Sequence, residues 1–133
     1  YFPEDQPGYI GDMPHTWVAA GLICAVRAMF IIERPADSSL EVAGGIPEDW
    51  WTQGAGVEHA PTWWGPVSVS VKRADQRREF TVRGECAPPG GFIARIPDPA
   101  QLKTASLNGE SLPLPEDGII RFDTLPADLV LEY

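Results

Sequence analysis

The strongest hydrophobic pattern in the chain is a continuous apolar run near its beginning. From His15 to Ile32 the sequence reads HTWVAAGLICAVRAMFII, in which Thr16 and Arg27 are the clearly polar residues. The run covers about four to five turns of an α-helix, and it lacks the single apolar stripe of a surface helix. We therefore predict a long buried helix over residues 15–32 that other protein surrounds on nearly every side.

The residues on either side of this run define the predicted helix and disfavour two other interpretations. Asp12 is a suitable N-cap, and Pro35 disfavours helix in the residue before it, so we expect the helix to end near Glu33 or Arg34. The run is shorter than the roughly 20 apolar residues that span a bilayer. Acidic residues precede it and no small-residue cleavage site follows, which disfavours a signal peptide. We expect no membrane partner.

From Leu40 onward the pattern changes to alternation of apolar and polar residues, which is typical of half-buried β-strands. Further short strands are predicted over residues 40–42, 56–60, 92–96, 119–122 and 129–133, and Asn108–Gly109 is a strong hairpin sequence. One turn of helix is expected over residues 47–51. The clearest alternation predicts a hairpin whose inward-facing residues are Val67, Val69, Val71, Phe80 and Val82.

About eight short strands without intervening helices indicate an antiparallel β-sandwich, which we favour over a barrel. The predicted fold class is therefore mainly β, an antiparallel β-sandwich preceded by one long buried α-helix. The chain divides into residues 1–34, an N-terminal loop with the apolar helix, and residues 35–133, the β-domain. Fourteen Pro and thirteen Gly fall between the apolar runs, as expected for the turns of such a domain.

The net charge of −9 opposes binding to nucleic acid, because contacts to phosphates need clustered cations. Half of the ten basic residues do lie close together in the sequence. Because they fall on the predicted hairpin, we interpret them as a solvated face of that hairpin and expect no nucleic-acid partner. These residues are Lys72, Arg73, Arg77, Arg78 and Arg83.

No catalytic, metal-binding or cofactor motif is present in the sequence. Cys24 and Cys86 lie in unlike surroundings and form no recognisable disulfide or zinc pattern, so the cellular compartment stays undetermined. The two histidines, His15 and His59, have no metal-ligand spacing. Asp12, Glu48, Asp49 and Glu58 are carboxylates of the type used in acid–base catalysis, but a surface role fits each of them better. We predict no catalytic residue, no metal and no cofactor.

Two tryptophan doublets, Trp50–Trp51 and Trp63–Trp64, lie in predicted turns. In such a doublet at a strand end, one ring usually enters the core while its neighbour points away. Core packing explains all four indoles. The functional alternative is that one or two of them form a flat surface for stacking against a sugar ring.

The order of these parts resembles the C-terminal end of bacterial glycoside hydrolases with an (α/α)6 toroid, notably the α-L-rhamnosidase-like group. The resemblance spans roughly residues 8–133. It is carried by the His at the start of the apolar helix, by Leu-x-Val-x-Gly-Gly-Ile-Pro-x-x-Trp from Leu40, by Ala-Pro-Thr-Trp-Trp-Gly-Pro-Val-Ser-Val from Ala60, and by Leu-Asn-Gly from Leu107.

The resemblance implies a location for a sugar pocket and for the catalytic groups. The family's His ahead of the last toroid helix, which borders that pocket, matches His15. The aromatic after it matches Trp17 loosely, since this chain has Pro-His-Thr-Trp where rhamnosidases have Asn-His-Tyr-Ala. Catalytic carboxylates lie on earlier toroid segments in the family. The implied substrate-binding residues are His15 and Trp17, and the doublet adds Trp63 and Trp64.

We therefore predict a non-catalytic C-terminal fragment or subunit of a bacterial glycoside hydrolase. In this interpretation the sandwich buries the inner face of the helix, and His15 with Trp17 forms a rim of a sugar pocket completed by the catalytic toroid. The expected partners are carbohydrate and the missing toroid, or a second copy bound through the apolar helix. The alternatives are a stand-alone carbohydrate-binding module that uses the Trp doublets and a structural interaction domain.

Overall fold

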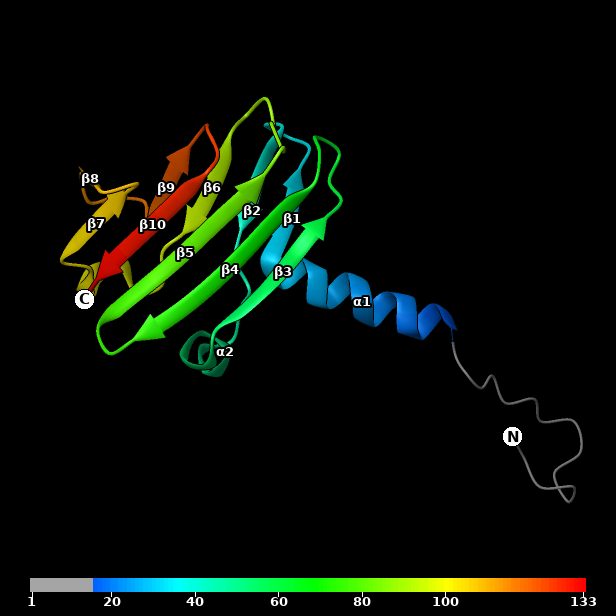
Figure 1. Ribbon diagram of the computed structural model, residues 1–133, viewed down its shortest axis with the longest axis horizontal. Helices are drawn as coiled ribbons and strands as arrows, with labels where there is room; N and C mark the ends of the chain where they lie inside the picture. Colours follow the sequence, from blue (N-terminus) through cyan, green and yellow to red (C-terminus); the bar gives the residue numbers. More distant parts are fainter. Residues whose placement is uncertain (1–15) are drawn as a thin grey trace, which may run out of the picture.

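The computed structural model describes residues 16–133, which form ten β-strands, two α-helices and a short 3-10 helix. The chain runs from an N-terminal helix into a β-rich body (Figure 1). In order, the elements are α1 (Thr16–Phe30), β1 (Ile31–Arg34), β2 (Ser39–Val42), α2 (Glu48–Gln53), β3 (Ala55–Ala60), β4 (Val67–Ala74), β5 (Arg77–Gly84), β6 (Phe92–Arg95), η1 (Pro99–Gln101), β7 (Thr104–Leu107), β8 (Glu110–Leu112), β9 (Ile119–Phe122) and β10 (Ala127–Glu132).

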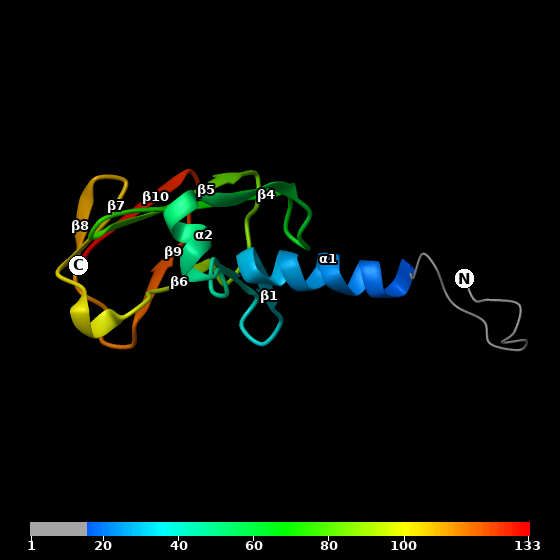
Figure 2. The same ribbon diagram turned by 90° about the horizontal axis from the view of Figure 1, so that it is seen from below.

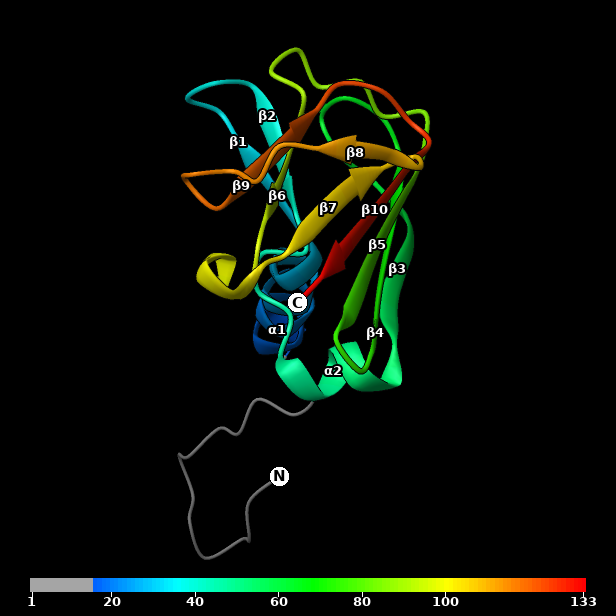
Figure 3. The same ribbon diagram turned by 90° about the vertical axis from the view of Figure 1, so that its left-hand side faces the viewer.

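The strands form two sheets that face each other, so the predicted mainly β sandwich preceded by one helix is confirmed (Figure 3). One sheet has the order β1-β2-β6-β9, and the other has the order β3-β4-β5-β10-β7-β8. Neighbouring strands are antiparallel in both sheets with the exception of β2 and β6, which pair in parallel. Short α2 lies at one open end of the sandwich, beside the ends of β3 and β4 (Figure 3).

The β4–β5 hairpin lies inside the larger sheet, between β3 and β10, with the predicted alternation. Its alternate residues Val67, Val69, Val71, Phe80 and Val82 are buried, whereas Ser70 on the opposite face is exposed and Ser68 is half-buried. The Phe80 ring packs edge-to-face against Trp51 of α2, with 4.7 Å between the ring centroids. In the opposite sheet, Phe92 and Phe122 stack at 5.1 Å. The period-2 pattern therefore identified the buried face correctly.

The helix was predicted to end near Glu33 or Arg34, and this prediction is wrong because the last four residues form a strand. Helix α1 ends at Phe30, and residues 31–34 continue as β1, which pairs with β2 across a turn at residues 35–38. Ile31 and Ile32 are β-branched and fit a strand, and pairing with β2 outweighs the helical pattern that precedes them. The division at residue 34 stays a prediction, although the β1–β2 hairpin crosses it.

Helix α1 projects away from the sandwich along the long axis of the molecule (Figures 1 and 2). Phe30 is its one buried residue, so the prediction that the sandwich buries the inner face of the helix is wrong for most of its length. The sandwich contacts the last turns of α1, and the earlier turns extend past the sheets. No helix in residues 16–133 combines the length and apolarity needed to span a membrane.

The basic residues of the β4–β5 hairpin do not all lie on a solvated face, as the sequence had suggested. Arg78 is buried with 6% exposure, because it occupies the same inward-facing register as Phe80 and Val82. Arg77 and Arg83 form ion pairs with carboxylates on the outer side of the sheet. Arg78 reaches the end of the sandwich, where its charge is paired with Glu48.

Candidate functional site

The surface of α1 is the largest concentration of exposed apolar side chains in the described part of the chain. Trp17 is 71% exposed, Ile23 is 69% exposed and Leu22 is 66% exposed. Single exposed apolar residues are common on proteins, but a contiguous patch marks an interaction site. We call this patch the α1 apolar surface, and its members are Trp17, Val18, Leu22, Ile23 and Val26.

A groove continues the α1 apolar surface towards the edge of the larger sheet. It lies between α1 and the edge strand β3 and has a volume of about 380 Å³. Apart from Arg27, every residue along it is apolar. The other lining residues are Leu22, Ile23, Val26 and Phe30 of α1 and Gly56 and Val57 of β3. The groove therefore adds an apolar concave surface next to the exposed apolar residues of α1.

The C-terminal turn of α1 is fixed firmly to the sandwich. The Arg27 guanidinium donates hydrogen bonds to the Glu33 carboxylate at 2.9 and 3.1 Å and to the Pro61 carbonyl at 2.7 Å. The Gly45 N–H donates to the Met29 carbonyl at 3.1 Å, and a Cβ on Gly45 would lie 3.2 Å from the Met29 Cα. Glycine permits this close backbone approach. The helix is thus held in one orientation by its last turn.

The two tryptophan doublets each divide between core and surface, as expected for a doublet at a strand end, so the interpretation that core packing explains all four indoles is wrong for Trp63. Trp51 is buried, and Trp50 is partly exposed beside Phe30. Trp63 is 69% exposed and Trp64 is half-buried, with 5.8 Å between the centroids of the two rings. The Thr62 hydroxyl accepts a hydrogen bond from the Trp64 N–H, which fixes the loop that carries Trp63.

The predicted substrate-binding residues fall in different parts of the molecule. His15 lies outside the described residues. Trp17 is in the first turn of α1, at the end that points away from the sandwich (Figure 2). Trp63 and Trp64 lie together on the β3–β4 loop. A substrate-binding role for these four residues stays a prediction.

Among the carboxylates that the sequence offered for acid–base chemistry, Glu48 is engaged in ion pairs. Glu48 accepts hydrogen bonds from Arg78 and Arg73, and these two guanidinium groups hold the pKa of its carboxyl below the usual value of 4.5. A general acid at neutral pH needs a raised pKa, so Glu48 is unsuited to that role. Asp12 lies outside the described residues. Within residues 16–133, no three His, Cys, Asp or Glu side chains are placed to hold a metal ion.

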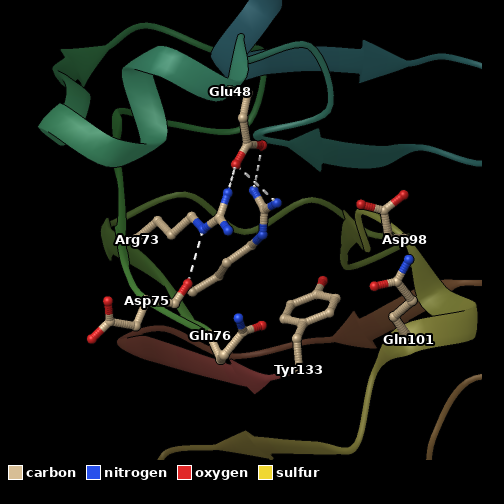
Figure 4. Close-up of a pocket in the computed structure, with 8 residues that line it drawn as sticks. Glu48, Arg73, Asp75, Gln76, Asp98, Gln101 and Tyr133 are labelled. Carbon is tan, nitrogen blue, oxygen red and sulfur yellow. Dashed lines mark hydrogen bonds and ion pairs between the residues drawn. The ribbon is translucent and has the colours of Figure 1, made fainter.

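A polar hollow at the α2 end of the sandwich was not expected from the sequence. Four separate segments of the chain line it, from Glu48 in α2 to Tyr133 after β10, so no short motif marks it (Figure 4). The one sequence feature that pointed towards it is the basic cluster, because Arg73 and Arg78 belong to both.

Comparison with protein-family models and with curated proteins finds no match to this sequence. Among solved structures, the fold is similar to part of a GH127 β-L-arabinofuranosidase from Geobacillus stearothermophilus T6, with a TM-score of 0.52 and 19% sequence identity. The likeness covers 87% of this chain and 18% of the arabinofuranosidase chain. The chain therefore shares its fold with a minor part of a glycoside hydrolase. The α-L-rhamnosidase-like group suggested by the motifs is not supported by this likeness.

Proposed function

We propose that this chain is a non-catalytic part of a glycoside hydrolase, in which the sandwich supports a catalytic domain and the α1 apolar surface packs against that domain. The observation that carries the proposal is the exposure of Val18, Leu22 and Ile23 on a helix whose last turn is firmly held. An exposed helix of this composition fits a protein neighbour better than water.

The energetic argument follows from the number of large side chains involved. Burial of one such side chain stabilises by about 1.5–3 kcal/mol relative to exposure. The members of the α1 apolar surface together therefore forgo an amount comparable with the whole stability of a domain, which is about 5–15 kcal/mol. The groove beside β3 extends the area that a partner would cover.

The similarity to the arabinofuranosidase supports a catalytic domain as the partner. This chain corresponds to 18% of that enzyme's length, which leaves a large remainder against which an equivalent helix would pack. The motif resemblance implies that the catalytic carboxylates lie on toroid segments ahead of the last helix. In this proposal the chain contributes support, and the bond-breaking groups belong to the neighbouring domain.

The finer proposal is that His15 and Trp17, at the start of α1, form a rim of the sugar pocket. The sequence motifs favour an α-L-rhamnosidase-like enzyme, whereas the similar solved structure is a β-L-arabinofuranosidase. What both have in common is glycoside hydrolysis. The substrate class proposed here is therefore a glycoside, and the rhamnosidase-like assignment rests on the motifs alone.

Two measurements on the purified chain test this function. Aryl α-L-rhamnosides and aryl β-L-arabinofuranosides should not be hydrolysed, and turnover that is lost in Glu48→Gln would contradict a non-catalytic role. The dye ANS, which fluoresces on apolar protein surface, should bind the native chain. The double variant Leu22→Lys/Ile23→Lys should lose most of that fluorescence, whereas Leu114→Lys, at an exposed apolar residue outside α1, should retain it. Equal fluorescence in both variants would exclude α1 as the docking surface.

A second candidate function, saccharide binding by a stand-alone module, is favoured by Trp63 alone. Its indole is exposed on a loop fixed by Thr62, which suits stacking against the C–H face of a sugar. Affinity electrophoresis in gels containing arabinan tests it. Trp63→Ala should abolish retardation of the chain, and Leu114→Ala should leave it unchanged. Unretarded migration of the unmodified chain would remove this candidate.

A further inference from the structure

The polar hollow lies at the end of the sandwich that α2 covers. It has a volume of about 280 Å³ and is bordered by α2, by the β4–β5 turn, by the segment from β6 to η1 and by the residue after β10. Figure 4 shows Glu48 and Arg73 on one side, Asp98 and Gln101 on the other, and the Tyr133 ring between them. Groups from distant parts of the sequence therefore converge on one small space.

One wall of the hollow is held rigidly by Arg78. Its guanidinium carbon lies 5.2 Å from the centre of the Trp51 ring and 5.5 Å from that of Tyr133. It also donates two hydrogen bonds to the Glu48 carboxylate, at 2.9 and 3.2 Å. Cation–π contact and a two-point hydrogen bond each restrict a guanidinium. The wall is thus preorganised, which lowers the entropic cost of binding a ligand.

The opposite wall offers polar groups that the protein itself leaves unused. Within residues 16–133, the side chains of Gln76, Asp98 and Gln101 make no hydrogen bond to other protein groups, and all three are exposed. The two amides supply both donors and acceptors, and the carboxylate supplies acceptors. The Gln76 carbonyl accepts a hydrogen bond from the Tyr133 N–H at 2.9 Å, which fixes this part of the turn.

The charges around the hollow favour an uncharged ligand. Glu48 and Asp98 line the hollow together with Arg73 and Arg78, and both arginines are already paired with Glu48. The Asp75 carboxylate points away (Figure 4). A phosphate would meet the unpaired carboxylate of Asp98, and a cation would meet two guanidinium groups. A neutral saccharide meets neither penalty. Its hydroxyls both donate and accept, and its C–H face suits the half-buried ring of Tyr133.

We propose that this hollow binds one residue of a neutral saccharide, through hydrogen bonds to Gln76, Asp98 and Gln101 and contact with the Tyr133 ring. The site lies at the α2 end of the sandwich and uses no residue of α1. It goes beyond the proposed function, because a glycan bound there would be held on the supporting domain itself.

The test is a titration of the isotopically labelled chain with L-arabinose, L-rhamnose and arabinan oligosaccharides, followed by two-dimensional NMR into the tens of millimolar. The backbone amides of Gln76, Gln101 and Tyr133 report on the hollow, and the indole N–H of Trp63 reports on the alternative surface. We expect saturable shifts at the hollow. Gln76→Ala/Gln101→Ala should weaken binding about three- to tenfold or more. Gln53→Ala, the same change on an exposed residue of α2 outside the hollow, should leave binding unchanged.

Each other result of this titration would overturn the proposal. Shifts confined to Trp63 would place saccharide binding on the β3–β4 loop, and saturable shifts with inorganic phosphate in place of sugars would make the hollow an anion site. Equal weakening by Gln53→Ala would assign the effect to altered folding. Absence of saturable shifts with all of the sugars would exclude the site. None of these results bears on the α1 apolar surface, whose test uses different residues and a different readout.

Discussion

The β4–β5 hairpin and helix α1 are both rich in apolar residues, but these residues are buried in the hairpin and exposed in the helix. In the hairpin, the apolar residues alternate with polar ones, and the apolar set is buried between the sheets. In α1, apolar residues point in nearly all directions, and Phe30 alone is buried. The apolar face of the hairpin is buried by other parts of residues 16–133, whereas most of the apolar surface of α1 is not.

This difference shows that the hydrophobic pattern of a segment indicates how many of its faces are covered by other protein. Alternation of apolar and polar residues indicates a strand with one buried and one solvated face. In this chain the second sheet packs against the buried face. An all-round apolar helix describes cover on several sides. The sandwich supplies one such side at the last turn of α1, and the proposal made above is that a protein neighbour supplies the rest.

The largest expected effect comes from removing a buried ring of the sandwich. Phe80→Ala should lower the free energy of unfolding by about 3–5 kcal/mol, because Phe80 is fully buried and packs against Trp51. Urea denaturation of the purified chain measures this loss. If the variant is too unstable to fold, Phe80→Leu should show a smaller loss in the same direction. A loss below that of a surface substitution would contradict the sandwich core.

An intermediate effect is expected at Glu41, a carboxylate of β2 that is buried and paired with Arg95 and Arg34. Hydrogen bonds from Arg95, followed by those from Arg34, hold the pKa of its carboxyl below the usual value of 4.5. Glu41→Gln should therefore cost about 1–2 kcal/mol at pH 7. This polar group is satisfied within the sandwich, in contrast to the apolar groups of α1.

The stability contributed by Glu41 should depend on acid pH. Because its pKa is lower in the folded chain than in the unfolded chain, the contribution is fully present above pH 4.5 and is lost as the pH falls through the folded-state pKa. Urea midpoints measured from pH 7 to pH 3 should fall less steeply for Glu41→Gln than for the unmodified chain. The exposed Glu110→Gln serves as the control. Identical slopes for all three proteins would contradict a lowered pKa for Glu41.

The smallest expected effect on stability is in α1. Ile23→Ala should change the free energy of unfolding by no more than about 0.5 kcal/mol, because Ile23 is 69% exposed in the isolated chain. The same urea experiment compares it directly with Phe80→Ala. A loss above about 2 kcal/mol would mean that α1 is already covered in solution, and the contrast between the two regions would disappear.

The sequence predicted the sandwich well where local patterns decide the structure. The alternation of Val67 to Val71 gave the buried face, and Asn108–Gly109 forms a tight hairpin with positive φ at both residues. Asn and Gly are the residues that tolerate this conformation. Ile31 to Arg34 was missed as a strand, because its β pairing depends on β2 and leaves no mark in a run that otherwise reads as helix.

Features that depend on long-range contacts were less accessible from sequence. The parallel pairing of β2 with β6 joins segments about fifty residues apart, and no local pattern specifies it. The period-2 register of β5 does place Arg78 inward, but the groups that pair its charge, Glu48, Trp51 and Tyr133, come from two other segments. The exposed Trp63 is the exception, because the doublet pattern had indicated one outward-facing ring.

The central claim, that the α1 apolar surface is built for a protein neighbour, is tested most directly by sedimentation velocity of the purified chain over a range of micromolar concentrations. The account predicts concentration-dependent self-association, which Leu22→Lys/Ile23→Lys should abolish without lowering the thermal midpoint. Leu114→Lys, a matched change at an exposed apolar residue outside α1, should leave the association intact. A chain that sediments as a monomer at every concentration, with or without the α1 substitutions, would contradict the claim.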